Sequence, residues 1–570
     1  MMPSEAEPRA ARGDAFAFLD RLLGLGAASH GRACALLAAL GLICFLPGLA
    51  SLQPMDRDEP RFAQASKQML ETGDLVDIRF QGEARHKKPV GIYWAQAAVV
   101  AAAEGLGVPQ ARTAIALYRI PSLVGALAAI LLTYWAALAF LPRRGALLAA
   151  ALFGACVMLA AEAHLAKTDA LLCACAVASL GGLARAWLRR GTPLDTGTVL
   201  AFWLGLALGV LVKGPMVPLF CALPALVLSV RARSARWLLA LRPGLGLPLT
   251  LALVAPWFLA IAWKSGGAFY GEAVGHDMLA KVGGGAEKHW APPGTYAVVF
   301  YATFWPGAAF AALAIPYAWG RRGTNAVAFL LAWIVPAWAL FEGVPTKLPH
   351  YVLPLMPAVA ILTVLALSAG ALDPARRGAR IVAGLVVLIP VGLTIGLVSA
   401  AWSLDRTVPL AGLPLLLAAC AVAILSWRAF ARALPERALL LAILAALLLS
   451  PGVFGLTQPD LSALKVSPRL AAIRDALPCA EPKVASLGYR EPSLVFLVGT
   501  DLATPSTAAE AASFLTQGGC RLVFVDSRFA AAFDAAIAAG TILPRVVGQV
   551  SGFNINGGRR VDLSAYAVIP

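Results

Sequence analysis

Residues 380–402 read RIVAGLVVLIPVGLTIGLVSAAW, a run with no charged residue after its first position. A helix of this length crosses the roughly 30 Å hydrocarbon core of a bilayer, where lipid forces each backbone polar group to find its partner within the helix. The same kind of run recurs near residues 32–51, 89–106, 116–138, 144–162, 169–188, 197–212, 215–231, 246–264, 295–317, 325–341, 349–368, 408–427 and 438–456. The pattern predicts an α-helical polytopic membrane protein.

Composition supports this prediction and excludes two other classes. Of the 570 residues 59% are hydrophobic and 14% are charged, whereas a soluble domain is about half apolar and a quarter charged. The net charge of +16 comes from short basic clusters between apolar runs. Such clusters are typical of topology signals, so we expect no nucleic-acid partner. We expect the chain to act as a monomer in the membrane.

The basic clusters predict the orientation of the runs, because short cytoplasmic loops carry the excess of Lys and Arg. All clusters lie on the cytoplasmic side only if run 89–106, which contains Glu104, does not cross. About thirteen crossings then remain, with a cytoplasmic N-terminus that has no cleaved signal and an extracytoplasmic segment after about residue 457. The clusters are Arg143 and Arg144; Arg185, Arg189 and Arg190; Arg231, Arg233 and Arg236; Arg321 and Arg322; Arg376, Arg377 and Arg380; and Arg428, Arg432 and Arg437.

The last part of the chain changes character, which divides it into a transmembrane domain (1–457) and a small extracytoplasmic α/β domain (458–570) of open function. Short β-rich runs at 483–487, 493–498 and 521–525 alternate with Ala-rich helical stretches at 508–515 and 529–538. Cys479 and Cys520 could pair as a disulfide if this part is extracytoplasmic. The other seven cysteines lie in apolar runs without metal-ligand spacing, which indicates core packing.

Three segments share the outer side: 52–115 with its interfacial helices, the loop around Asp169, and 265–294. The first contains MDRDEPRFAQASKQMLETGDLVDIRFQGEARHKKPVGIYW, with acids at its start and bases at its end. Such charges often only solvate a surface. An amphipathic helix between them, over 62–70, favours a shared cavity, and an enzyme that uses a lipid phosphate needs both cations and a carboxylate. The acids are Asp56, Asp58 and Glu59, and the bases are Arg85, His86, Lys87 and Lys88.

Further polar residues stand at predicted outer ends of spans. Asp169 lies in HLAKTDALL, Lys213 in LVKGP, and Lys347, His350 and Tyr351 in TKLPHYVLPLMP. Each alone could be a helix cap or a snorkelling side chain. Because all of these residues lie on the predicted outer side of the membrane, we expect them to form a single site.

The third outer segment contains His276 and His289 on either side of three glycines, which make it flexible enough to act as a lid. The two histidines are thirteen positions apart and no nearby acid has ligand spacing. We therefore favour a structural or substrate-contact role over a metal site.

Five motifs in order, RDEPRFAQASKQMLETGDLV, HKKPVGIYW, LAKTDALL, LVKGP and TKLPHYVLPLMP, resemble the GT-C transferases of the protein-mannosyltransferase and aminoarabinose lipid A transferase group. The likeness covers residues 32–368. It implies a GT-C fold and an inverting glycosyltransferase that uses an undecaprenyl-phosphate-linked sugar and no nucleotide sugar. It also implies a periplasmic active site in the bacterial inner membrane, lipid A or a related envelope glycolipid as acceptor, and 4-amino-4-deoxy-L-arabinose as the sugar.

The resemblance also implies roles for single residues. Asp58 would be the catalytic carboxylate, Lys88 its neighbouring cation, Asp169 the second acid and Lys213 a contact of the carrier phosphate. Further expected substrate-binding residues are Asp56, Glu59, Arg61, Arg85, Lys87, His276, Lys281, Lys347 and Tyr351.

One position departs from the family pattern. The aminoarabinose enzymes usually carry Glu just before the Lys-Pro pair, where this chain has Lys87. This puts in doubt a divalent metal held by that Glu and by His276 or His289, so a metal stays open and no other cofactor is expected. An additional cation also suits an acidic sugar such as galacturonate better than a cationic aminosugar.

Two other functions remain open. A protein O-glycosyltransferase would have the same core with a peptide acceptor. A transporter or lipid flippase is disfavoured, because the polar residues gather at one face rather than at the bilayer centre and no matching pair of broken helices is visible.

Overall fold

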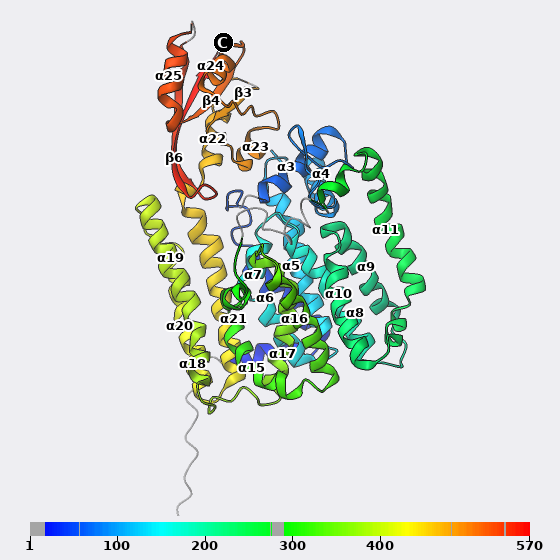
Figure 1. The fold of residues 1–570 in the computed structure, drawn as a ribbon. Coiled ribbons are helices and arrows are strands. Elements are labelled where there is room, and N and C mark those ends of the chain that lie inside the picture. The colour runs from blue at the N-terminus through cyan, green and yellow to red at the C-terminus, as the bar shows by residue number, and fades with distance from the viewer. Residues whose placement is uncertain are drawn as a thin grey trace, which may run out of the picture.

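The structure, a computed structural model, describes residues 17–55, 58–273, 275, 290–479, 481–540 and 543–569. A bundle of long helices carries a smaller unit with a β-sheet at one end (Figure 1). The bundle and its outer segments comprise α1 (Ala17–Ala27), α2 (His30–Phe45), α3 (Glu59–Thr72), β1 (Arg79–Phe80), β2 (Glu83–Ala84), α4 (Gly91–Gly105), α5 (Ile115–Ala137), α6 (Arg143–Gly154), α7 (Val157–Ala163), α8 (Asp169–Leu188), α9 (Thr196–Lys213), α10 (Met216–Ala232), η1 (Arg236–Leu241), α11 (Pro243–Lys264), α12 (Ala268–Tyr270), α14 (Thr295–Thr303), α15 (Ala308–Arg321), α16 (Asn325–Gly343), η3 (Pro349–Leu355), α17 (Met356–Ser368), α18 (Ala379–Gly384), α19 (Leu388–Asp405), α20 (Leu413–Ala431) and α21 (Pro435–Ser450).

The chain is a multi-pass membrane protein. Within the described residues, 9 helical segments are long and apolar enough to cross a bilayer, and the number is 10 if α6 and α7, bent by 62°, count as one broken span. Two shorter apolar helices, α2 and α10, lie beside them. Helix α4 is not among the apolar spans, which agrees with the expectation that run 89–106 does not cross.

Helix α8 lies at the centre of the bundle, because 89% of its most apolar window is buried by other parts of the protein. Its close packing against α5 depends on Gly125, where an added Cβ would lie 2.7 Å from the Cα of Leu171. Small residues allow such backbone approach between membrane helices. The N-terminal end of α8 lies near the start of α3, because the amide of Ala166, three residues before α8, donates to Glu59.

The C-terminal unit is built on a mixed four-stranded sheet in the order β3-β4-β6-β5. Strand β3 pairs parallel to β4, with Lys483 opposite Arg521, and β5 and β6 form an antiparallel hairpin. Its elements are α22 (Val466–Asp475), β3 (Lys483–Leu487), α23 (Pro492–Val498), α24 (Ala508–Thr516), β4 (Arg521–Asp526), α25 (Ala530–Ala538), β5 (Arg545–Asn554) and β6 (Arg559–Val568). A disulfide joins Cys479 to Cys520, with Cα atoms 6.3 Å apart.

One prediction for this unit is wrong. The run 493–498, predicted as a strand, forms helix α23, with Pro492 at its first turn. A short apolar run does not distinguish a strand from a buried helix, and Pro is favoured at a helix start. The hairpin of β5 and β6 was not predicted; burial alternates along β6 but not regularly along β5.

The C-terminal unit docks on helix α3 through α23. The side chain of Thr500 accepts a hydrogen bond from Gln64 (2.7 Å) and donates one to Glu71 (2.6 Å). Lys67 donates to the carbonyl of Phe496 (3.1 Å) and lies 3.7 Å from Glu71, and burial lowers the pKa of the Lys67 ammonium. The ring of Phe496 is fully buried in the bundle. Helix α3 is therefore held from both sides, by the bundle and by the C-terminal unit.

We predict that Thr500→Val loosens this docking without unfolding the protein. The valine keeps the shape but removes both hydrogen bonds, which costs about 1 kcal/mol. The expected result is faster hydrogen exchange of the α3 amides, measured by mass spectrometry. Thr516→Val, on α24, is the matched control and should leave α3 unchanged; equal exchange in the two variants would contradict the prediction.

Candidate active site

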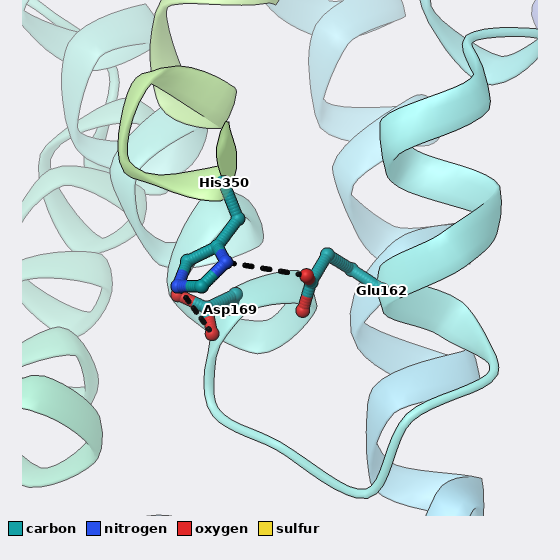
Figure 2. Close-up of side chains that lie close together, drawn as sticks. All are labelled: Glu162, Asp169 and His350. Atoms are coloured by element: carbon teal, nitrogen blue, oxygen red, sulfur yellow. Dashed lines mark ion pairs between the residues drawn. The ribbon is translucent and has the colours of Figure 1, made fainter. Parts of the chain in front are cut away.

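Five ionisable side chains form a continuous network at the end of the bundle that carries α3. His350 lies between two carboxylates, with Nδ1 3.6 Å from Oε1 of Glu162 and Nε2 3.7 Å from Oδ2 of Asp169 (Figure 2). Lys167 lies 3.4 Å from Glu162, and Lys213 forms an ion pair with Asp169. The two lysines balance the two carboxylates, so the network is neutral when the imidazole is neutral and positive when it is protonated.

The helix order explains why these residues meet. Asp169 is the first residue of α8 and Lys213 the last residue of α9, and an acid at a helix N-terminus and a base at a C-terminus are both favoured by the helix dipole. Because the two helices are consecutive and packed against each other, these ends come together. Glu162 lies in the last turn of α7, and η3 brings His350 to them from far along the chain.

A second, fully buried ion pair ties the first outer segment to this network. Glu59 and Arg119 have no exposed side-chain surface and bond at 2.8 and 3.0 Å. The other donors of Arg119 are used by the carbonyls of residues 49, 52 and 53, at 2.8 to 2.9 Å. Glu59 also accepts from the amide of Ala166 (2.9 Å), in the loop that leads to Asp169. The residue after Asp58 is thus anchored to the loop that carries the second acid.

Asp58 lies just before α3 and remains accessible, with 52% of its side chain exposed. The guanidinium of Arg85 is 4.0 Å from its carboxylate and stacks over the ring of Phe62 at 5.0 Å. The Nε atom of Arg85 is buried and has no hydrogen-bond partner among the described residues. A carboxylate and a buried cation therefore face each other at the start of α3.

The remaining predicted residues take different positions. Lys87 and Lys88 are half-buried in the link from β2 to α4, and Arg61 is half-buried in the first turn of α3. Lys347 is buried and donates to the carbonyl of Val344 (2.7 Å), and the ammonium of Lys213 lies 5.4 Å from the ring centre of Tyr351. The predicted residues Asp56, His276, Lys281 and His289 lie outside the described residues.

No role was predicted for Glu162, Lys167 or Arg119, whereas His350 was among the polar residues expected to share one site. Glu162 and Arg119 were visible as charges inside apolar runs, which are costly unless paired. Lys167 and His350 stood within the quoted motifs, but spacing along the chain did not reveal that both contact Glu162.

The donor set does not fit a resident divalent metal. Glu162, Asp169 and His350 offer atoms within 4.8 Å of one another, an arrangement that resembles a metal site. However, Lys167 and Lys213 already pair with these two carboxylates, and a metal would have to displace both ammonium groups. Lys87, which stands where the aminoarabinose enzymes carry Glu, has an ammonium group that does not bind a metal either. The described residues thus favour electrostatic chemistry by lysine, histidine and carboxylate.

The chain is thus a multi-pass helical bundle with an acid- and base-lined site at one end and a small α/β unit beside that end (Figure 1). Among solved structures, the chain is similar to ArnT from Cupriavidus metallidurans bound to undecaprenyl phosphate, with a TM-score of 0.71, 19% identity and coverage of 93% of this chain and 97% of that chain. The archaeal oligosaccharyltransferase AglB from Archaeoglobus fulgidus matches with a TM-score of 0.50 and 14% identity, over 89% of this chain and 70% of that chain. The chain has the ArnT fold.

Sequence comparison points to the same group. An undecaprenyl phosphate-alpha-4-amino-4-deoxy-L-arabinose arabinosyl transferase of Pseudomonas fluorescens is 29% identical over 334 residues, 57% of this chain and 58% of the relative. One of Erwinia tasmaniensis is 27% identical over 313 residues, 54% of each chain. The chain therefore spans little more than half the length of the curated relatives it matches, and no protein-family model matches it. The resemblance to the aminoarabinose lipid A transferases is confirmed.

Proposed function

We propose that the chain is a glycosyltransferase that moves a sugar from undecaprenyl phosphate to lipid A or a related envelope glycolipid, with inversion at the anomeric carbon. The main support for this proposal is that contacts between side chains link two acids, Asp58 and Asp169, and a cation beside each of them. Asp58 faces Arg85, and Glu59 ties it to the loop before Asp169, which pairs with Lys213. A carboxylate beside several cations is what departure of a lipid phosphate requires.

In the proposed reaction, the carrier phosphate leaves the anomeric carbon as the acceptor oxygen attacks. Lys88, Lys213 and Arg85 offset the charge that develops on the phosphate. Asp58 takes the proton of an acceptor hydroxyl, or orients the acceptor if that is already a phosphate. The ion pair with Asp169 positions Lys213 for this role. His350 contacts Asp169 and positions it in turn.

The proposal includes an orientation in the bacterial inner membrane. The proposed orientation has thirteen crossings, which would be α2, α5, α6 with α7, α8, α9, α10, α11, α14 with α15, α16, η3 with α17, α18 with α19, α20 and α21. The N-terminus is then cytoplasmic, and the site and residues 458–570 are periplasmic. The disulfide between Cys479 and Cys520 supports a periplasmic location for residues 458–570, because disulfides persist in the periplasm.

Aminoarabinose is the first candidate sugar, because the similar curated proteins carry that sugar in their names. Galacturonate is the second, favoured by Lys87, whose cation would attract a uronic acid and repel an aminosugar.

Lys87→Glu tests the choice of sugar. If position 87 faces the sugar, reversing its charge should shift the ratio of kcat/KM for uronic and amino sugars by roughly tenfold toward the aminosugar. Lys87→Gln should give an intermediate ratio. The ratio is measured with both carrier-linked donors in competition. An unchanged donor preference in Lys87→Glu would remove the galacturonate proposal.

The proposed function itself is tested by mass spectrometry of lipid A and total envelope glycans from cells with and without the gene. A sugar present on lipid A only when the gene is present supports the proposal, and its mass distinguishes aminoarabinose from a uronic acid. A gene-dependent sugar on secreted proteins instead would favour a protein O-glycosyltransferase, and no change in any glycan would favour transport.

A further inference from the structure

A basic cavity lies at the end of the bundle opposite the candidate active site. It has a volume of about 660 Å³ and opens between the ends of α8 and α10, the start of α16 and the short helix η1. Its lining residues are Trp187, Arg190, Gly191, Arg231, Ala232, Ser234, Arg236, Trp237 and Asn325. Three of them are arginines, and no acid is among them.

Two other arginines at the same end of the bundle have acidic partners. Arg144 pairs with Glu436, and Arg437 pairs with Asp20 at 2.9 Å. Within the described part of the chain, Arg190, Arg231 and Arg236 have no carboxylate within ion-pair distance. The cavity therefore holds an excess of positive charge that the described residues do not neutralise.

The contacts of two of these arginines hold them at the cavity. Arg190 stacks on Trp187 at 3.8 Å, and Arg231 donates one hydrogen bond to the carbonyl of Gly323 at 2.8 Å. Trp187 is itself fixed by a bond to the carbonyl of Asn325 (3.1 Å). A guanidinium has five N–H donors, so most donors of Arg231 remain for a ligand.

A second, mostly apolar cavity of about 790 Å³ adjoins the basic one and shares Arg231 with it. It runs between α10 and α16 along the membrane-facing surface, where Val227 and Val335 are exposed. Its other lining residues are Leu228, Gly320, Arg322, Gly323, Ala328, Leu331, Ala332 and Pro336. Arg231 thus lies where the basic cavity meets the groove between α10 and α16, which is the second cavity.

We propose that this pair of cavities binds one anionic phospholipid. Its headgroup phosphate lies among Arg190, Arg231 and Arg236, and one acyl chain lies along the groove between α10 and α16. Guanidinium groups bind phosphate in forked geometry, and basic pockets between membrane helices select anionic headgroups. The charge of the first cavity and the apolar lining of the second fit the two parts of such a lipid.

The proposal is tested by native mass spectrometry of the full chain in detergent with added phosphatidylglycerol or phosphatidylethanolamine. Wild type should retain phosphatidylglycerol in preference. The double variant Arg190→Gln/Arg231→Gln should lose that retention by more than roughly tenfold, since each basic residue near an anionic surface contributes about a fivefold factor. Arg233→Gln is the matched control, because Arg233 is the residue directly after α10, two positions from Arg231, but lines neither cavity.

Two further arms separate the parts of the site. Val335→Trp should fill the groove and weaken phosphatidylglycerol retention while the arginines stay intact. Inorganic phosphate, added as a competitor at equal concentration, should not displace the lipid. Equal retention of the two lipids, equal loss in Arg233→Gln and the double variant, or displacement by inorganic phosphate alone would each overturn the proposal.

Discussion

Replacing Asp58 by Asn should abolish sugar transfer while leaving the protein folded. The amide has nearly the same shape but does not accept a proton or carry the charge that faces Arg85. Loss of a general base costs about 10²- to 10⁴-fold in rate. We therefore expect kcat to fall by this factor, with little change in KM for the carrier, measured by transfer of labelled sugar with purified protein.

The control for this variant is Glu83→Gln, an exposed acid on β2 of the same outer segment. It should retain full transfer. Both variants should melt at the wild-type temperature, because Asp58 is half exposed. A rate for Asp58→Asn within a few-fold of Glu83→Gln would show that Asp58 neither accepts the proton nor orients the acceptor.

Replacing Arg119 by Met should lower the free energy of unfolding by roughly 3–5 kcal/mol, because it leaves Glu59 as an unpaired buried charge. The carbonyls of residues 49, 52 and 53 would lose their donors as well. The loss should appear as a lower melting temperature in detergent and as faster hydrogen exchange at residues 49–59. Arg119→Lys should fall between wild type and Arg119→Met, since it restores the charge but not the five donors.

Arg144→Met is the matched control, because Arg144 also pairs with a glutamate but both side chains are over 40% exposed. Exposed ion pairs contribute only about 0–1 kcal/mol. A melting temperature for Arg119→Met that equals that of Arg144→Met would mean that the buried pair does not hold the first outer segment in place.

The sequence predicted most of the bundle, because lipid imposes long apolar helices and the basic clusters restrict their direction. It also predicted Asp169 and Lys213, which the structure joins in an ion pair. It did not predict that Glu59 is buried against Arg119, because the partners are 60 positions apart and only the packed fold brings them together. Glu59 accordingly fits a positioning role better than the substrate contact that the motif implied.

The least predictable part was the C-terminal unit. Run 493–498 is apolar enough for a strand, yet α23 docks on α3 and buries Phe496 in the bundle. This contact depends on the tertiary arrangement of α3, α5 and the loop at Ala166, which no local pattern encodes.

The most direct test of the proposed function is a reconstituted transfer reaction with defined substrates. Purified wild-type protein is supplied with lipid A and with undecaprenyl phosphate linked to aminoarabinose or, separately, to galacturonate. We predict that one of these sugars appears on lipid A with equimolar release of undecaprenyl phosphate, and that Asp58→Asn gives neither product. Release of no carrier phosphate by wild type from either donor, or undiminished transfer by Asp58→Asn, would contradict the proposed glycosyltransferase and its site.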